Sequence, residues 1–169
     1  MSTTLTTART TAQVTREELE ALGLSSLHRT VEDELNDEAA GKTTILIGCM
    51  DEVPVGFGML NWAGPRDPAS CAAAIGAPEI YRLTVLSSHQ SGGVGSTMIS
   101  DFEQMVKARG IEAISLGVAK ANPKARQLYD RLGYSVCVET YYDEYQFADD
   151  TGKVHHIRDE CEYMIKELC

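Results

Sequence analysis

The run Glu79-Ile80-Tyr81-Arg82-Leu83-Thr84-Val85-Leu86, followed by Gln90-Ser91-Gly92-Gly93-Val94-Gly95-Ser96, decides the fold of this chain. β-branched and aromatic residues predict a strand over residues 79–86. The glycines allow a tight turn, and the apolar residues after them, at helical spacing, predict a helix that continues to about Arg109. A strand that passes through a glycine loop into a helix predicts a mixed α/β or α+β domain.

The glycine loop is also a candidate anion site. The first N–H groups of a helix have no partner within the helix, and the helix dipole places about half a positive charge there. A phosphate or pyrophosphate fits such a site. The loop is not a Walker loop, because no Lys-Ser or Lys-Thr follows, and it is not a dinucleotide GxGxxG. Taken alone, it indicates a structural turn rather than a ligand site.

The other predicted elements surround this unit. Strands are expected over residues 4–10, 43–50, 54–62, 111–119, 134–147 and 154–165. Helices are expected over residues 15–22, 26–37 and 124–132. Thr15 and Glu18 form a capping box, and Asn122-Pro123 is a typical helix start. The long loop over residues 63–78 is either a functional lid or a segment that packs over the sheet.

The length of 169 residues predicts one domain over residues 1–169. Residues 1–13 are Thr-rich and are expected to be disordered or to hold the weak first strand. They have no apolar core of a secretory signal, and no apolar run approaches the ~20 residues of a membrane span. A cytoplasmic protein is therefore expected.

Charge limits the partners. The chain has 15 Lys and Arg against 25 Asp and Glu, a net charge of −10. This balance argues against a nucleic-acid binder and against an anionic membrane surface, since both need a basic face. Acidic residues dominate residues 15–42 and 139–169, whereas residues 43–138 carry balanced charge. The middle of the chain could host a polyanion, and the acidic ends suit a cationic amine.

The five cysteines indicate no disulfide framework and no zinc site. They are widely spaced, odd in number and form no CxxC pair. His155, His156 and Cys161 lie close in sequence but match no standard spacing of metal ligands. We expect reduced thiols and no metal.

Three linked motifs resemble the GNAT superfamily of acetyl-CoA-dependent N-acetyltransferases. Gln90, Gly93 and Gly95 fit its Q/R-x-x-G-x-G/A motif, and the strand before them resembles its fourth strand. The run over residues 117–134 resembles its fifth strand and the helix that follows. The resemblance covers about residues 45–134. It implies a single domain with a mixed, mostly antiparallel central sheet, splayed between strands 4 and 5 and flanked by helices.

The resemblance also implies a cofactor site and an acid. Backbone groups of strand 4 would pair with pantetheine and the thioester, the glycine-loop amides would hold the pyrophosphate, and Asn122 would contact the pantetheine arm. The implied acetyl-CoA contacts are Leu83, Thr84, Val85, Gln90, Ser91, Gly92, Gly93, Val94, Gly95, Ser96 and Asn122. Tyr129 would protonate the leaving thiolate. The alternative interpretation is that Tyr129 is a core tyrosine on the apolar face of its helix. For Asn122 the alternative is a helix cap, and both roles can hold together.

The general base is less defined. Many GNAT enzymes carry a glutamate where this chain has Gly117. Glu79 matches the acidic residue that some of them use, directly or through water, and strand alternation predicts one face for Glu79, Tyr81 and Leu83. The alternative for Glu79 is a solvated carboxylate at the strand end. Asp143 and Glu144 are reserve candidates, with a solvated edge as their alternative.

The resemblance implies an N-acetyltransferase that acts on a primary amine by direct attack on acetyl-CoA. The acidic ends favour a small cationic amine or an amine of a peptide or protein. The alternative is a non-catalytic module that binds acyl-CoA or an amine. The third hypothesis is an enzyme that acts on a nucleotide phosphate. It is less well supported, because no catalytic lysine follows the glycine loop. The chain is either a monomer or a homodimer: GNAT relatives often dimerise, and the long terminal strands offer edges that could pair.

Overall fold

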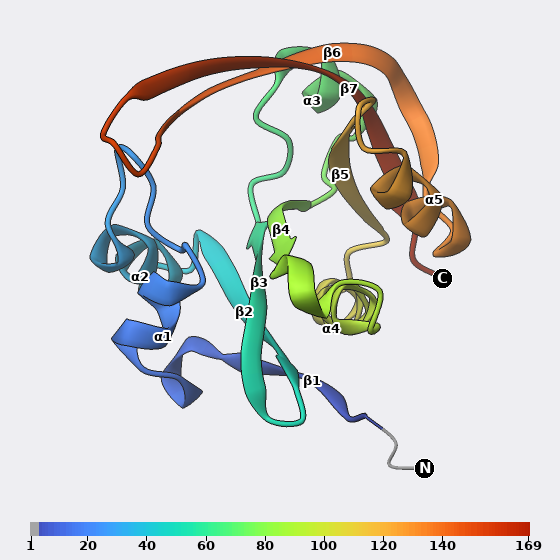
Figure 1. The fold of residues 1–169 in the computed structure, drawn as a ribbon. Helices are drawn as coiled ribbons and strands as arrows, with labels where there is room; N and C mark the ends of the chain where they lie inside the picture. Colours follow the sequence, from blue (N-terminus) through green and yellow to red (C-terminus); the bar gives the residue numbers. More distant parts are fainter. Residues whose placement is uncertain (1–3) are drawn as a thin grey trace.

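The computed structural model describes residues 4–169 and is built on one seven-stranded sheet (Figure 1). Its strands are β1 (Thr6–Thr10), β2 (Thr43–Met50), β3 (Val53–Asn61), β4 (Glu79–Val85), β5 (Ala113–Ala119), β6 (Ser135–Ala148) and β7 (Val154–Glu167). Its α-helices are α1 (Arg16–Ala21), α2 (Val31–Ala39), α3 (Pro68–Ala73), α4 (Val94–Ala108) and α5 (Pro123–Arg131), with short 3-10 turns η1 (Thr11–Gln13) and η2 (Ser87–His89).

The strand order β1-β2-β3-β4-β5-β7-β6 confirms the predicted mixed sheet. Only β4 and β5 run parallel, and every other neighbouring pair is antiparallel. The parallel ladder consists of two pairs, Glu79 with Ser115 and Ile80 with Leu116. Beyond these pairs the two strands diverge, which is the predicted splay.

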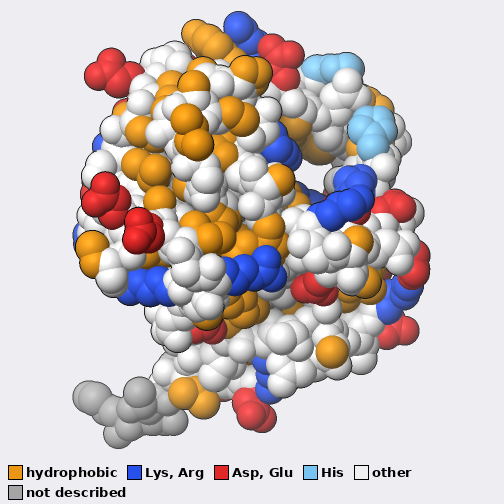
Figure 2. Space-filling model, turned by 180° about the vertical axis from the view of Figure 1, so that it is seen from behind, with side chains coloured by type: hydrophobic (Ala, Val, Ile, Leu, Met, Phe, Trp, Pro, Cys, Tyr) orange, Lys and Arg blue, Asp and Glu red, His pale blue; other side chains and the backbone are white. Residues whose placement is uncertain are grey.

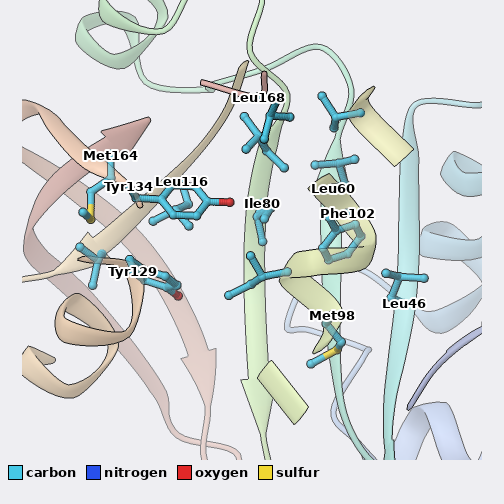
Figure 3. Packing of buried hydrophobic residues seen from close by; sticks show 14 of the residues in the cluster. Leu46, Leu60, Ile80, Met98, Phe102, Leu116, Tyr129, Tyr134, Met164 and Leu168 are labelled. Carbon is cyan, nitrogen blue, oxygen red and sulfur yellow. The ribbon is translucent and has the colours of Figure 1, made fainter. Parts of the chain in front are cut away.

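Helices cover both faces of the sheet. Leu19, Leu24 and Val31 of the α1–α2 segment pack against Ile45 and Phe57 on one face. The other face is covered by α4 and α5 (Figure 3). The apolar side chains that α4 buries are Val94, Met98, Ile99, Phe102 and Val106. Burial of each contributes about 1.5–3 kcal/mol, so this face holds α4 and the glycine loop before it in place.

Strands β6 and β7 form a long hairpin that arches over one end of the sheet towards α2 (Figure 1). Each strand has 14 residues, and Gly152, with φ of +82°, lies in the turn between them. The hairpin turn lies where the sequence predicts it. The hairpin therefore forms a wall opposite the segment before α2.

Two predicted segments need correction. The second helix begins at Val31 rather than Ser26, because Thr30 and Asp33 form a capping box, and Ser26 to Arg29 instead make a turn closed by a hydrogen bond. The loop over residues 63–78 contains α3, whose start is capped by Asp67 and followed by proline. The predicted first strand is present as β1, and residues 1–3 lie outside the described part of the chain. Across residues 4–169, no helix is both long and apolar enough to cross a membrane.

Candidate active site

A bulge in β4 sets the direction of its side chains. Arg82 has φ of +50°, and the β3–β4 register shifts between Phe57 and Met59. After the bulge Leu83 packs against Phe102 of α4, whereas Tyr81 belongs to the opposite cluster. The prediction that Leu83 shares a face with Glu79 and Tyr81 is therefore wrong, because one extra residue in a strand reverses the alternation that follows.

The bulge and the splay leave one side of β4 open. Thr84 and Val85 pair with Phe57 and Gly56 of β3. On the β5 side, the described ladder ends at Ile80, so the backbone from Leu83 to Val85 has no strand partner there. Backbone groups of this kind can pair with an extended ligand, as a neighbouring strand would.

The glycine loop has the backbone geometry of an anion cradle. Gly93 is the N-cap residue of α4, with φ of +90° and no side-chain cap, and Ser91 has φ of +65°. A Cβ added at Gly93 or Gly95 would meet nothing within 4 Å. The free N–H groups of the first turn, which include those of Val94 and Ser96, are therefore approachable by a pyrophosphate.

Two other loop residues shape the turn. The Gln90 side-chain amide donates a hydrogen bond to the Val85 carbonyl over 3.1 Å, which ties the loop to the end of β4. A Cβ added at Gly92 would lie 2.3 Å from Cε of Met50, so a larger residue there would push the loop away from β2.

Asn122 caps α5. Its Oδ1 accepts a hydrogen bond from the backbone N–H of Ala125 over 3.1 Å, and the residue is exposed. The cap is therefore present, and the contact of Asn122 with a cofactor stays a prediction.

Tyr129 lies on the buried face of α5 (Figure 3). The residue is 8 % exposed, and its ring meets that of Tyr134 edge-to-face with 6.1 Å between centroids. Burial raises the pKa of the Tyr129 hydroxyl, so it stays protonated at neutral pH. Among the described residues, the hydroxyl has no hydrogen-bond partner within the protein, which leaves it free to donate to a ligand.

Glu79 is buried at the start of β4. It is 6 % exposed, so the alternative of a solvated carboxylate at the strand end is wrong. Desolvation raises the pKa of Glu79 above its usual value, and Arg66, whose Nε lies 3.4 Å from Oε2, partly offsets that rise. A carboxylate with a raised pKa is well suited to accept a proton near neutral pH.

A pocket of about 900 Å³ opens beside Glu79. It lies between the segment before α2, strand β4 and the β6–β7 hairpin, and Figure 2 shows a hollow below the His side chains, with Lys or Arg side chains on its rim. Its carboxylates are Glu34, Asp37, Asp67, Glu79, Asp143 and Glu144, and its arginines are Arg29, Arg66 and Arg82. Five tyrosines also line it, Tyr81, Tyr141, Tyr142, Tyr145 and Tyr163, and the remaining polar lining residues are Ser26, His28 and Gln146. Acidic groups outnumber basic ones, which favours a cationic ligand.

The sequence comparison places the chain in a family. The model of the Acetyltransferase (GNAT) family matches residues 11–134, well over half of the chain. The chain belongs to the GNAT acetyltransferase family. Comparison of this GNAT acetyltransferase with curated protein sequences gives no match.

Solved structures share the fold of this GNAT protein. An N-acetyltransferase from Staphylococcus aureus Mu50 is 13% identical, with 98% of this chain and 99% of that chain covered and a TM-score of 0.66. The ribosomal-protein-S18-alanine N-acetyltransferase from Escherichia coli is 13% identical, with 97% and 94% covered and a TM-score of 0.63. A GNAT family acetyltransferase from Elizabethkingia anophelis, solved with acetyl-CoA bound, is 15% identical, with 99% and 100% covered and a TM-score of 0.58.

Sequence reasoning missed one residue of the GNAT pocket. Tyr141 of β6 lies against Gly117 of β5, and an added Cβ there would lie 1.9 Å from the Tyr141 hydroxyl oxygen. The signal in the sequence is Gly117 itself, since a glycine within a strand marks a close approach of another group.

The reserve carboxylates Asp143 and Glu144 both line the pocket and are exposed. Arg158 Nε lies 3.0 Å from Glu144 Oε1, whereas no salt bridge joins Asp143 to a cation within residues 4–169. The same part of the chain contains no group of three or more His, Cys, Asp or Glu that could hold a metal ion.

Proposed function

We propose that this GNAT protein transfers the acetyl group of acetyl-CoA to a primary amine. The observation that carries the proposal is the position of Glu79: a buried carboxylate with a raised pKa, where the acidic pocket meets the β4–β5 splay. The pocket supplies a place for the amine, and the splay supplies a place for the thioester.

The cofactor side follows from the open backbone. The β4 backbone of Leu83, Thr84 and Val85, which has no strand partner on the β5 side, would bind pantetheine, and the amides of the loop over residues 91–96 would bind the pyrophosphate. Gln90 would hold the loop against β4, and Asn122 would contact the pantetheine arm while it caps α5.

The chemistry is a direct transfer. Glu79, by itself or through one water, takes a proton from the acceptor ammonium, and the neutral nitrogen attacks the thioester carbonyl carbon. A C–N bond forms and the C–S bond breaks, while a backbone N–H of β4 stabilises the carbonyl oxygen as it gains negative charge. The thiolate leaves with its electron pair and takes the hydroxyl proton of Tyr129, which its raised pKa keeps protonated until that moment. The acylated nitrogen then loses its second proton to the tyrosinate, which gives the neutral amide and restores Tyr129, and Glu79 releases its proton to solvent.

The acceptor is proposed to be a small cationic amine or an amine of a peptide or protein. The excess of carboxylates in the pocket supports a cation. The printed name of the Escherichia coli neighbour gives an alanine of a ribosomal protein as its acceptor, which keeps a peptide amine among the candidates. A homodimer and a cytoplasmic location stay predictions.

The first experiment is thermal unfolding with acetyl-CoA, with ATP and NAD as controls. Acetyl-CoA at 100 times Kd should add ~2.7 kcal/mol of stability, a rise in Tm of about 5 °C or more. The second experiment measures thiol release with 1,4-diaminobutane, tyramine, a lysine-containing peptide and a peptide with a free N-terminal alanine.

Each outcome decides between the two functions. Thiol release that depends on an amine supports the transferase. Stabilisation by acetyl-CoA without amine-dependent thiol release favours a non-catalytic module that binds acyl-CoA, the alternative that the missing side chain at Gly117 allows. No stabilisation at millimolar acetyl-CoA would rule out both functions.

A further inference from the structure

The Tyr141 hydroxyl occupies the space beside Gly117, where β4 and β5 begin to diverge. Ser115 is the parallel partner of Glu79, and Gly117 lies two residues further along β5, where the β4–β5 ladder has ended. An added Cβ at Gly117 would lie 1.9 Å from Oη and 3.2 Å from Cζ of Tyr141. The hydroxyl of a residue on β6 therefore occupies the position that a side chain of β5 would take.

The Tyr141 ring is held firmly in this position. It meets the ring of Tyr163 edge-to-face, with 5.7 Å between centroids. Tyr163 is buried, and its hydroxyl shares a hydrogen bond of 2.9 Å with Ser115 of β5. Aromatic pairs of this geometry contribute about 0.5–1.5 kcal/mol beyond their buried area, so the hydroxyl position is set before any ligand binds.

Two carboxylates, Glu79 and Asp143, line the same pocket as Tyr141. Burial raises the pKa of the Tyr141 hydroxyl, and the negative charges of Asp143 and Glu79 raise it further. The hydroxyl therefore stays protonated, and its oxygen keeps lone pairs that can accept hydrogen bonds. Tyr141, Glu79 and Asp143 give the pocket three acceptor groups, and the carboxylate of Asp143 remains without a salt bridge within residues 4–169, whereas that of Glu79 also contacts Arg66 over 3.4 Å.

A primary ammonium group matches this set of acceptors. It carries one positive charge and three N–H donors, whereas a secondary ammonium has only two. A guanidinium or a carboxylate fits less well, because the first is planar and the second carries the wrong charge.

We propose that Tyr141 is an acceptor-binding residue: its hydroxyl oxygen, seated over Gly117, accepts a hydrogen bond from the nitrogen of a primary alkylammonium that also contacts Glu79 and Asp143. The inference rests on the proposed function and deepens it. Tyr141 fixes the nitrogen beside Glu79, at the end of the pocket that opens into the splay, and it makes the site selective for primary over secondary amines.

The test measures the acetylation kinetics of Tyr141→Phe. The substrate is whichever of the amines named above gives the unchanged protein its highest kcat/KM, and the N-methyl derivative of that amine is the comparison. Phenylalanine keeps the ring packing and removes only the hydroxyl. We expect kcat/KM for the primary amine to fall at least 10-fold, mainly through KM, and the preference over the N-methyl derivative to shrink. Tm and the KM for acetyl-CoA should stay unchanged. Ser135→Ala, which removes an exposed hydroxyl from the same strand, is the matched control.

Gly117→Ala tests the shared space. The new methyl group must displace the Tyr141 hydroxyl, so the KM for the amine should rise as it does in Tyr141→Phe. In the double variant the second change should add little, because both remove the same contact. Unchanged amine kinetics in Tyr141→Phe, or an effect confined to acetyl-CoA, would overturn the assignment.

The two proposals fail in different ways. If the unchanged protein acetylates one of the named amines and Tyr141→Phe is equally active, only the role of Tyr141 is lost. If the unchanged protein acetylates none of the amines, the proposed function fails and the role of Tyr141 fails with it.

Discussion

Arg82, the residue at the bulge of β4, donates a hydrogen bond from Nη1 to Oε1 of Glu34 on α2 over 3.3 Å. Its Nη2 donates to the carbonyl of Gly23 over 3.0 Å, and Arg29 Nε donates to the same Oε1 of Glu34 over 2.9 Å. One carboxylate therefore joins the strand that faces the splay to the α1–α2 segment that forms one wall of the pocket.

Glu34→Ala should destabilise the fold. Glu34 is 5 % exposed, so its loss leaves two arginines without their shared partner. We expect a loss of about 3 kcal/mol, or roughly 6–12 °C in Tm, measured by thermal unfolding.

Glu32→Ala is the matched control for this change. Glu32 lies on the same helix, is 58 % exposed and pairs with Arg16 at the surface. Its loss should cost no more than about 1 kcal/mol. Equal effects of the two substitutions would contradict the structural role of Glu34.

Glu79→Gln should abolish most of the activity and change its pH dependence. Glu79 accepts a proton only when ionised, so kcat/KM of the unchanged protein should fall as the pH drops through its raised pKa. Removal of a general base typically costs about 100-fold or more. In Glu79→Gln the remaining activity should no longer fall in this way as the pH drops. If kcat/KM of the variant depended on pH as it does in the unchanged protein, another residue would be the general base.

The same substitution should stabilise the protein at neutral pH. Desolvation raises the pKa of Glu79 in the folded state, so folding favours the protonated form and the buried charge costs stability above that pKa. The unchanged protein should therefore gain stability relative to Glu79→Gln as the pH falls through the raised pKa. Thermal unfolding of both proteins between pH 4 and pH 8 measures the difference, and a gap that is constant with pH would contradict it.

Tyr129→Phe should lower kcat while it leaves the affinity for acetyl-CoA unchanged. The hydroxyl has no hydrogen-bond partner among the described residues, so its removal should change Tm little, whereas loss of a general acid costs about 100-fold or more. Stopped thiol release with intact acetyl-CoA binding, measured by calorimetric titration, supports the assignment. Full activity of Tyr129→Phe would show that Tyr129 is a core residue and not the general acid.

Gly95→Ala should separate stability from cofactor binding. A Cβ at Gly95 meets nothing within 4 Å, and alanine favours a helix over glycine by about 0.8–1.0 kcal/mol, so Tm should rise. The methyl group would occupy the open space through which the pyrophosphate approaches the first turn of α4, and we expect the Kd for acetyl-CoA to increase at least 10-fold.

Ser100→Ala on the exposed face of α4 is the control for Gly95→Ala. It also favours the helix but lies beyond the first turn, so the Kd should stay unchanged. Unaltered acetyl-CoA affinity in Gly95→Ala would show that the pyrophosphate does not approach this turn.

Local patterns determined much of the fold. The strand over residues 79–86, the glycine loop and the helix after it were predictable because turn chemistry and helical periodicity act over a few neighbouring residues. The cap at Asn122 and the hairpin turn were predictable for the same reason. The start of α2 was not, because Thr30 with Asp33 made a better cap than Ser26 did.

Long-range packing decided the rest. The sequence by itself determined the family motifs, the glycine cradle, and Glu79 and Tyr129 as candidates. Only the tertiary structure decided that Glu79 is buried, that Leu83 turns to the other face after the bulge at Arg82, and that Tyr141 fills the space above Gly117. These features depend on β3, α2 and β6, which lie far from β4 and β5 in the chain. Burial and charge at a site arise from such distant contacts, and no local pattern encodes them.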